Sequence, residues 1–139
     1  MALFPSKEWA EELYNRVNAD EEYGRAASDW EGTFTLLVKE EEDKLEKPFI
    51  LWLDPWHGKV RGFEILKDID EKKSDFILEG DYSVWKGVLQ GKKDATKQMM
   101  AGKLKLKGSM TYILKRAKAS NALTKILTKI PTEFIDETD

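Results

Sequence analysis

The sequence predicts an α+β domain in which helices pack on one face of a mostly antiparallel, five-stranded sheet. Between residues 33 and 80, four apolar or alternating stretches have strand spacing, and polar loops join them. Helical segments follow, then a fifth strand and a last helix. Short connections favour antiparallel neighbours, and a helical crossover returns the fifth strand to the same sheet.

Length and composition define the class of protein. With 139 residues, of which 41% are hydrophobic and 35% charged, the chain predicts a single folded domain over residues 1–139. The absence of cysteine excludes disulfides, thiol nucleophiles and thiolate metal sites. No apolar run reaches the length of a signal sequence or a membrane span, so we expect a cytoplasmic protein.

Two helices are predicted before the sheet. The first spans residues 7–17 and begins after Ser6, a residue type that favours the N-cap position. Its apolar residues recur every four positions and form one stripe, namely Trp9, Leu13 and Val17. Asp20 is the expected N-cap of a second, shorter helix that ends near Ala27.

Four strands follow. Residues 34–38 alternate as in a half-buried strand, whereas residues 49–53 are apolar on both faces and predict an interior strand. A turn over residues 54–59 leads to a strand at 60–66. After a charged loop, residues 76–80 form the fourth strand.

The next segment alternates between helix and strand. Asp81 is expected to cap a helix that Gly91 ends, and Asp94 to cap a short helix that stops at Gly102. In residues 103–107 leucines alternate with lysines, which predicts a fifth strand with its leucines facing inward.

The last helix carries two apolar faces. It is expected to begin after Ser109 and to end at Pro131. The apolar positions of its two halves are rotated by roughly 140° at about 100° per residue. The helix therefore bends or restarts between Ala117 and Ala122, with Ser120 as a candidate cap, or its halves pack on different surfaces. Residues 132–139 are expected to form a loose acidic tail.

Charge is unevenly distributed. Residues 85–130 hold twelve basic residues and one acidic residue, although the whole chain has a net charge of −3. Lys103, Lys105 and Lys107 form one outward row. They either resist edge-to-edge strand pairing or meet an anionic membrane surface or lipid head group. Nucleic acid is not an expected partner, because aromatic residues are not interleaved with these lysines and the acidic remainder repels a polyanion.

The sequence offers few groups for catalysis. His57 is the only histidine, so no metal site is expected. One interpretation pairs Asp54 with His57 as acid and base across a turn. The other makes Asp54 a turn cap and His57 a solvated loop residue. With no nucleophile and no phosphate-binding glycine loop, neither an enzyme nor a cofactor is expected.

One run of residues resembles a known family. Gly91, Lys92, Met99, Met100, the segment GKLKLKG at residues 102–108 and Met110 are similar to the sterol carrier protein type 2 family. The segments NADEEYGRAASDWEGT and LDPWHGK are similar to its single-domain prokaryotic branch. This resemblance implies a five-stranded sheet covered by helices. It also implies an apolar tunnel between the sheet and the C-terminal helices that holds fatty acids, acyl-CoA or sterols.

We therefore expect a domain that binds, and could also transfer, a lipid or fatty-acyl ligand. Methionine suits the wall of such a site because it adapts its shape, although it also fills ordinary cores. The expected ligand contacts are Trp85, Leu89, Met99, Met100, Leu104, Leu106, Met110, Ile113, Leu114, Leu123, Ile126 and Leu127. The last three would act as a lid. The alternative is a protein-interaction or dimerisation module with a filled core, and the oligomeric state stays open.

The energetic cost of an empty tunnel limits this hypothesis. A dry void of ~400 Å³ would cost about 10 kcal/mol at ~24 cal/mol per Å³. That equals the whole stability of a typical domain. Without a ligand, the tunnel is therefore expected to be collapsed, hydrated or filled with a scavenged lipid.

Overall fold

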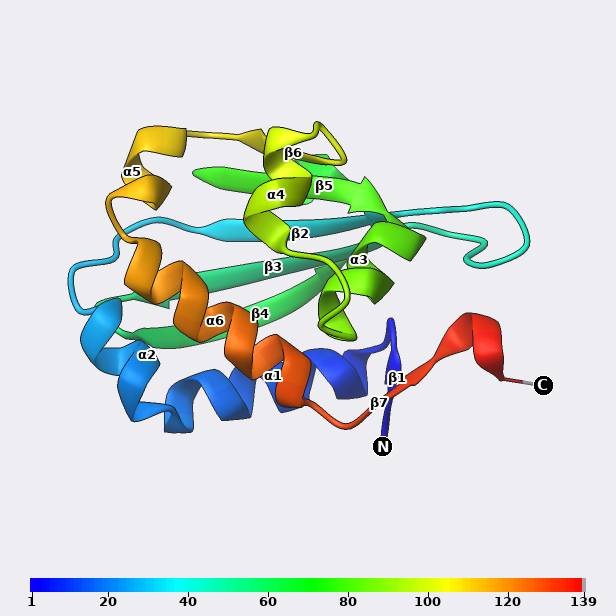
Figure 1. Ribbon diagram of the computed structural model, residues 1–139, viewed down its shortest axis with the longest axis horizontal. Coiled ribbons are helices and arrows are strands. Elements are labelled where there is room, and N and C mark those ends of the chain that lie inside the picture. The colour runs from blue at the N-terminus through cyan, green and yellow to red at the C-terminus, as the bar shows by residue number, and fades with distance from the viewer. Residues whose placement is uncertain (139) are drawn as a thin grey trace.

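The computed structural model describes residues 1–138 and places the helices over one face of a five-stranded sheet (Figure 1). The strands are β2 (Phe34–Lys39), β3 (Phe49–Trp56), β4 (Lys59–Leu66), β5 (Phe76–Asp81) and β6 (Leu104–Lys107). Their order is β4-β3-β2-β5-β6, and only the β2-β5 pair is parallel. The predicted fold class is confirmed, including the interior position of β3.

The parallel pair arises because the chain crosses the sheet between β4 and β5. This connection contains the 3₁₀ turn Ile69–Glu71 and lies on the face opposite the helices. There the Ser74 hydroxyl bonds the buried Thr35 hydroxyl, and the Lys72 ammonium lies 4.3 Å from the centre of the Trp52 ring. The expectation that all early strands run antiparallel is therefore wrong for β5.

Six α-helices form the layer that covers the inner face of the sheet. They are α1 (Lys7–Ala19), α2 (Glu21–Ala26), α3 (Tyr82–Leu89), α4 (Ala95–Met100), α5 (Met110–Leu114) and α6 (Ala117–Lys129). Side chains of the predicted N-caps accept backbone N–H bonds at α1, α2, α4 and α5, whereas Asp81 at α3 does not. The predicted caps are Ser6, Asp20, Asp94 and Ser109. None of the helices in residues 1–138 has both the length and the apolar composition needed to cross a bilayer.

The last helix is divided, as its two apolar faces indicated, but the break lies before the predicted segment. Helix α5 ends at Leu114, and Arg116 is the N-cap of α6, so Ser120 lies inside α6 and caps nothing. The Arg116 guanidinium lies 3.5 Å from the centre of the Tyr112 ring and pairs with Asp29 at 3.2 Å. Through the Arg116–Asp29 ion pair, the break contacts the loop that precedes β2.

A close backbone contact fixes the β3-β4 hairpin against α2. His57 and Gly58 form its two-residue turn, and both have positive φ, at 49° and 85°. The turn is shorter than the predicted one because β3 continues to Trp56. A Cβ on Gly58 would lie 2.4 Å from the carbonyl oxygen of Gly24 in α2. Glycine is required there for both conformation and space.

The prediction of a loose C-terminal tail is wrong for residues 132–138, and Asp139 lies outside the described residues. Strand β7 (Thr132–Phe134) pairs in parallel with β1 (Ala2–Phe4), and the 3₁₀ turn Ile135–Glu137 follows. Phe134 is buried beside Phe4. A single buried aromatic residue in an acidic stretch gives no periodicity, so the sequence pattern did not reveal this contact.

The terminal segment is held by a largely buried polar cluster. The Asp136 carboxylate accepts hydrogen bonds from the Tyr82 hydroxyl at 2.7 Å and from the Lys86 ammonium at 3.0 Å. Burial opposes ionisation of Asp136, but these hydrogen bonds and the charge of Lys86 together hold its pKa below the usual value. Because the folded-state pKa is depressed, this stabilisation is present above about pH 4 and is lost as the pH falls further.

Replacing Asp136 by asparagine should therefore lower the free energy of unfolding at neutral pH. The expected loss is about 1.5 to 3 kcal/mol, the usual contribution of a hydrogen bond to a charged group. Urea unfolding at a series of pH values checks this, and the difference from wild type should shrink below about pH 4. The matched control is Glu133→Gln on the exposed side of β7. An equal loss in both variants would show that Asp136 has no special role.

Candidate functional site

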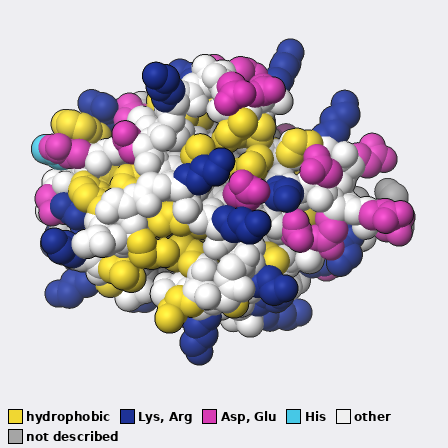
Figure 2. Space-filling view, turned by 90° about the horizontal axis from the view of Figure 1, so that it is seen from above, with side chains coloured by type: hydrophobic (Ala, Val, Ile, Leu, Met, Phe, Trp, Pro, Cys, Tyr) yellow, Lys and Arg dark blue, Asp and Glu magenta, His cyan; other side chains and the backbone are white. Residues whose placement is uncertain are grey.

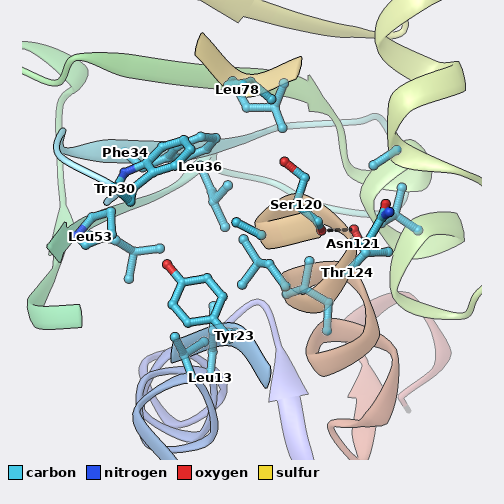
Figure 3. A pocket seen from close by; sticks show the side chains of 18 of the residues that line it. Leu13, Tyr23, Trp30, Phe34, Leu36, Leu53, Leu78, Ser120, Asn121 and Thr124 are labelled. Atoms are coloured by element: carbon cyan, nitrogen blue, oxygen red, sulfur yellow. Dashed lines mark hydrogen bonds between the residues drawn. The ribbon is translucent and has the colours of Figure 1, made fainter. Parts of the chain in front are cut away.

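A cavity of about 120 Å³ lies between the inner face of the sheet and helix α6 (Figure 3). The sheet and its hairpin contribute Phe34, Leu36, Leu53, Pro55, Val60, Leu78 and Leu106. The wall formed by α1, α2, α3 and the loop before β2 consists of Leu13, Tyr14, Val17, Tyr23, Trp30, Trp85 and Val88. The wall formed by α4, α5 and α6 consists of Ala95, Thr96, Met99, Ile113, Ala119, Ser120, Asn121, Leu123, Thr124 and Leu127.

Local sequence explains why space is left here. Strand alternation turns Phe34, Leu36 and Leu78 toward the helices, so the sheet side is apolar. On the opposite side, α4 and α6 present small residues, Ala95 and Ala119, where larger side chains would fill the gap. The cavity follows from this combination of large residues around the space and small residues facing it.

None of the residues that line the cavity carries a charge. The indole N–H groups of Trp30 and Trp85 donate to the carbonyl oxygens of Gly32 and Leu37, at 3.0 and 3.1 Å. The Thr124 hydroxyl donates to the carbonyl oxygen of Ser120 at 3.0 Å. A mostly apolar wall of this kind accepts apolar molecules. The arrangement suits hydrocarbon and does not suit an ion.

Half of the predicted contact residues line the cavity. They are Trp85, Met99, Leu106, Ile113, Leu123 and Leu127. Three others, Leu89, Leu104 and Ile126, are at most 5% exposed but are packed in the core outside the cavity. Periodicity identified their buried faces but could not separate packed core from cavity wall.

The remaining three predicted contacts lie on the surface. Met100 is 83% exposed, Leu114 57% and Met110 37%. Helices α4 and α5 are only six and five residues long, so each presents one side to the cavity and the other to solvent. These three residues are therefore not brought into the cavity.

The sequence interpretation missed the walls contributed by the first half of the chain. Leu13, Tyr23, Phe34, Leu36 and Leu78 all contact the cavity. Four of them had a signal, because the stripe that predicted α1 and the alternation that predicted β2 and β5 include every one of these residues except Tyr23. What the pattern lacked was the information that these apolar faces meet around a shared space.

Asp54 and His57 do not form an acid-base pair. Asp54 accepts two hydrogen bonds from Arg61, at 3.0 and 3.2 Å. The Nε2 atom of His57 lies 2.7 Å from the Glu31 carboxylate, and the imidazole stacks on Trp56. Each residue is thus engaged elsewhere, and the structure gives the enzyme interpretation no support. Residues 1–138 also contain no cluster of side chains that could hold a metal ion.

An exposed apolar rim lies beside the cavity, at the edge of the molecule formed by α4, β6 and α5. We define the rim as Met100, Met110 and Leu114. Figure 2 looks onto this edge and shows apolar side chains open to solvent among lysines. Within residues 1–138, no lysine from position 92 to position 118 forms an ion pair. The rim therefore combines apolar side chains with unneutralised positive charge.

Comparison with solved structures finds the same fold in other proteins. A crystal structure of sterol carrier protein 2 is 32% identical, with a TM-score of 0.81, and the match covers 89% of this chain and 96% of that one. The solution structure of a conserved hypothetical protein from Thermus thermophilus is 30% identical, with a TM-score of 0.81, covering 92% and 90%. Sterol carrier protein 2 from Yarrowia lipolytica is 18% identical, with a TM-score of 0.56, covering 86% and 88%, and shares the fold.

Sequence comparison gives the family. No curated protein sequence matches the chain. A family model described as the SCP-2 sterol transfer family matches residues 10–120, which include most of the cavity wall. That match, together with the 32% identical sterol carrier protein 2 structure, shows that this chain belongs to the SCP-2 sterol transfer family.

Proposed function

We propose that the chain binds one lipid in the cavity and transfers it between surfaces without chemical change. Membership of the family supports lipid or sterol binding or transfer in general. The observation that carries the proposal for this chain is the cavity wall, which is mostly apolar and contains no charged side chain. A fatty-acyl chain or a sterol-like ring system is the ligand that such a wall favours.

The volume of the cavity indicates that it must widen around such a ligand. A cavity of ~150 Å³ accommodates a molecule the size of benzene, so about 120 Å³ is too small for a long acyl chain. The empty space costs only about 3 kcal/mol at ~24 cal/mol per Å³. The domain can therefore stay folded without ligand, unlike one with a dry tunnel of ~400 Å³.

Helix α6 is the element that we propose moves. It begins at the Arg116 break and ends before Pro131. An exposed Lys125–Glu22 ion pair at 3.1 Å links it to α2, and such pairs contribute only about 0 to 1 kcal/mol. Burial of hydrocarbon returns ~0.8 kcal/mol per CH₂ group. A long acyl chain would thus return free energy against the cost of displacing α6, which includes uncovering the buried Ile126 and Leu127.

Native mass spectrometry of freshly purified protein, before and after solvent extraction, tests this proposal. A co-purifying mass of several hundred daltons, or stoichiometric uptake of an added fatty acid after extraction, is the expected result. A stable dimer with no uptake would instead favour the protein-interaction module. That alternative needs a filled core, and the cavity argues against one.

We further propose that the exposed apolar rim contacts an anionic membrane when lipid is exchanged. Each lysine near such a surface contributes on the order of 1 kcal/mol. Insertion of Met100 and Leu114 would add the burial of apolar surface. An anionic bilayer would both bury the apolar side chains of the rim and neutralise the charge of the lysines around it.

The double variant Met100→Ser with Leu114→Ser should bind vesicles rich in phosphatidylserine about tenfold more weakly than wild type. This corresponds to roughly 1.4 kcal/mol of lost apolar burial. Vesicle flotation measures the effect, with phosphatidylcholine vesicles as the control. Fatty-acid uptake from solution should be unchanged, since neither residue lines the cavity. Equal flotation of variant and wild type would contradict the role of the rim.

A further inference from the structure

The Tyr23 hydroxyl belongs to the most deeply buried polar side chain of the cavity wall that has no side-chain hydrogen bond within residues 1–138. Tyr23 of α2 is only 6% exposed, and burial raises its pKa to about 12, so its hydroxyl stays protonated. Figure 3 shows the hydroxyl directed into the cavity. The hydroxyl forms no hydrogen bond with residues 1–138, and its oxygen is not among their fully enclosed unpaired polar atoms, so it remains accessible from the cavity. Hydroxyls inside proteins are normally paired.

The other polar residues of the wall differ from Tyr23. Trp30, Trp85 and Thr124 already donate to backbone carbonyl oxygens. Tyr14 and Ser120 are half-buried, while Thr96 and Asn121 are exposed and can bond water. Tyr23 is thus the nearly buried wall residue whose hydrogen-bonding capacity is left for a ligand.

The backbone around Tyr23 fixes this orientation. Its N–H donates to the Asp20 carboxylate at 2.7 Å, and its carbonyl oxygen accepts from the N–H of Ala27 at 2.8 Å. The next residue, Gly24, lies against Gly58 in the hairpin, where a Cβ on Gly58 would come within 2.4 Å of the Gly24 carbonyl oxygen. The hydroxyl is therefore presented to the cavity by two capping bonds and a close backbone contact.

The chemistry of the wall limits what can pair with Tyr23. No lining residue is charged, so a carboxylate or phosphate buried here would lack a counter-ion. A neutral oxygen carries no such penalty. We propose that Tyr23 donates a hydrogen bond to an uncharged oxygen, such as a hydroxyl, ketone or ester oxygen, on the buried part of the bound lipid. Any charged head group then lies outside the cavity. This inference rests on the proposed lipid-binding function and names its ligand class.

The test compares a long-chain methyl ketone with an alkane of equal length, each displacing a fluorescent fatty acid. Tyr23→Phe removes only the hydroxyl and should weaken ketone binding about tenfold, the effect of one hydrogen bond, with alkane binding unchanged. The infrared band of the bound ketone carbonyl should lie at lower frequency in wild type than in Tyr23→Phe. The matched control is Tyr112→Phe, which removes a hydroxyl that accepts a hydrogen bond from the Glu31 N–H at 2.9 Å and does not line the cavity. It should behave like wild type in both measurements.

Two results would overturn the inference in different ways. If Tyr23→Phe leaves the carbonyl band and the ketone preference unchanged while both ligands still bind, the lipid does not pair with Tyr23 and the proposed function survives. If wild type displaces no fluorescent lipid with either ligand and takes up none itself, the proposed function fails together with the inference.

Discussion

Replacing Ala119 by phenylalanine should abolish lipid uptake without destabilising the domain. Ala119 is 3% exposed, and its side chain contacts the cavity from α6. A phenyl ring at this position would occupy the space of about 120 Å³ that we assign to the ligand. Filling empty apolar space recovers part of its cost, so we expect stability to be unchanged or raised by up to about 2 kcal/mol. Urea unfolding and fluorescent fatty-acid titration measure the two effects.

Ala122 provides the matched control. It lies on the same helix and is 2% exposed, but it does not line the cavity. Ala122→Phe should therefore overpack a filled region and cost about 1 to 3 kcal/mol. If Ala119→Phe destabilises the domain as much as Ala122→Phe, there is no usable space beside Ala119. Full uptake by a stable Ala119→Phe variant would place the ligand elsewhere.

Replacing Met99 by glutamate should weaken fatty-acid uptake at least about tenfold, because a carboxylate in an uncharged wall repels the ligand and binds water. Met99 and Met100 are neighbours on α4, yet only Met99 contacts the cavity, and Met100 is 83% exposed. Met100→Glu introduces the same charge one residue away and should leave uptake from solution unchanged. Titration of both variants with the same fluorescent fatty acid measures the difference.

Comparing the two variants distinguishes the loss of a ligand contact at Met99 from a general effect of the added charge. If both glutamate variants lose uptake equally, the loss comes from a change in net charge or in α4 stability. If neither does, Met99 does not contact the ligand. Circular dichroism of the two variants should show the same folded domain, because both residues lie in a short surface helix.

Local patterns predicted the secondary structure well, for reasons that individual residues make clear. Ser6, Asp20, Asp94 and Ser109 cap helices because their short polar side chains reach the free N–H groups of the first turn. Alternation in β2 identified its inward face. The resemblance of the GKLKLKG segment to a known family then connected these elements to a lipid-binding fold, and the family match confirmed that connection.

Contacts between distant segments were not predictable in the same way. The parallel β1-β7 pair joins both ends of the chain through a few backbone bonds and the burial of Phe134. Nothing in the pattern of the last eight residues indicates it. Tyr23 was missed for a related reason: α2 is six residues long, and its place in the cavity wall depends on the approach of Gly24 to Gly58.

The residues that line the cavity were predictable only in part, for the same reason. Helical spacing marks Leu123, Ile126 and Leu127 alike as apolar, but only Leu123 and Leu127 face the open space. Whether an apolar side chain packs against a neighbour or lines a cavity depends on the size of the residue opposite. Here the small side chains of Ala95 and Ala119 decide that question.

The most direct measurement of the central claim is an isotope-filtered NMR experiment on methyl-labelled protein with an unlabelled fatty acid. If the lipid lies between the inner face of the sheet and α6, the methyl groups of Leu36, Leu78 and Leu127 should show intermolecular contacts. Ile50 and Leu66, buried on the opposite face, should show none. Contacts restricted to Met100 and Leu114, or contacts on the opposite face, would contradict the assignment of the cavity as the lipid site.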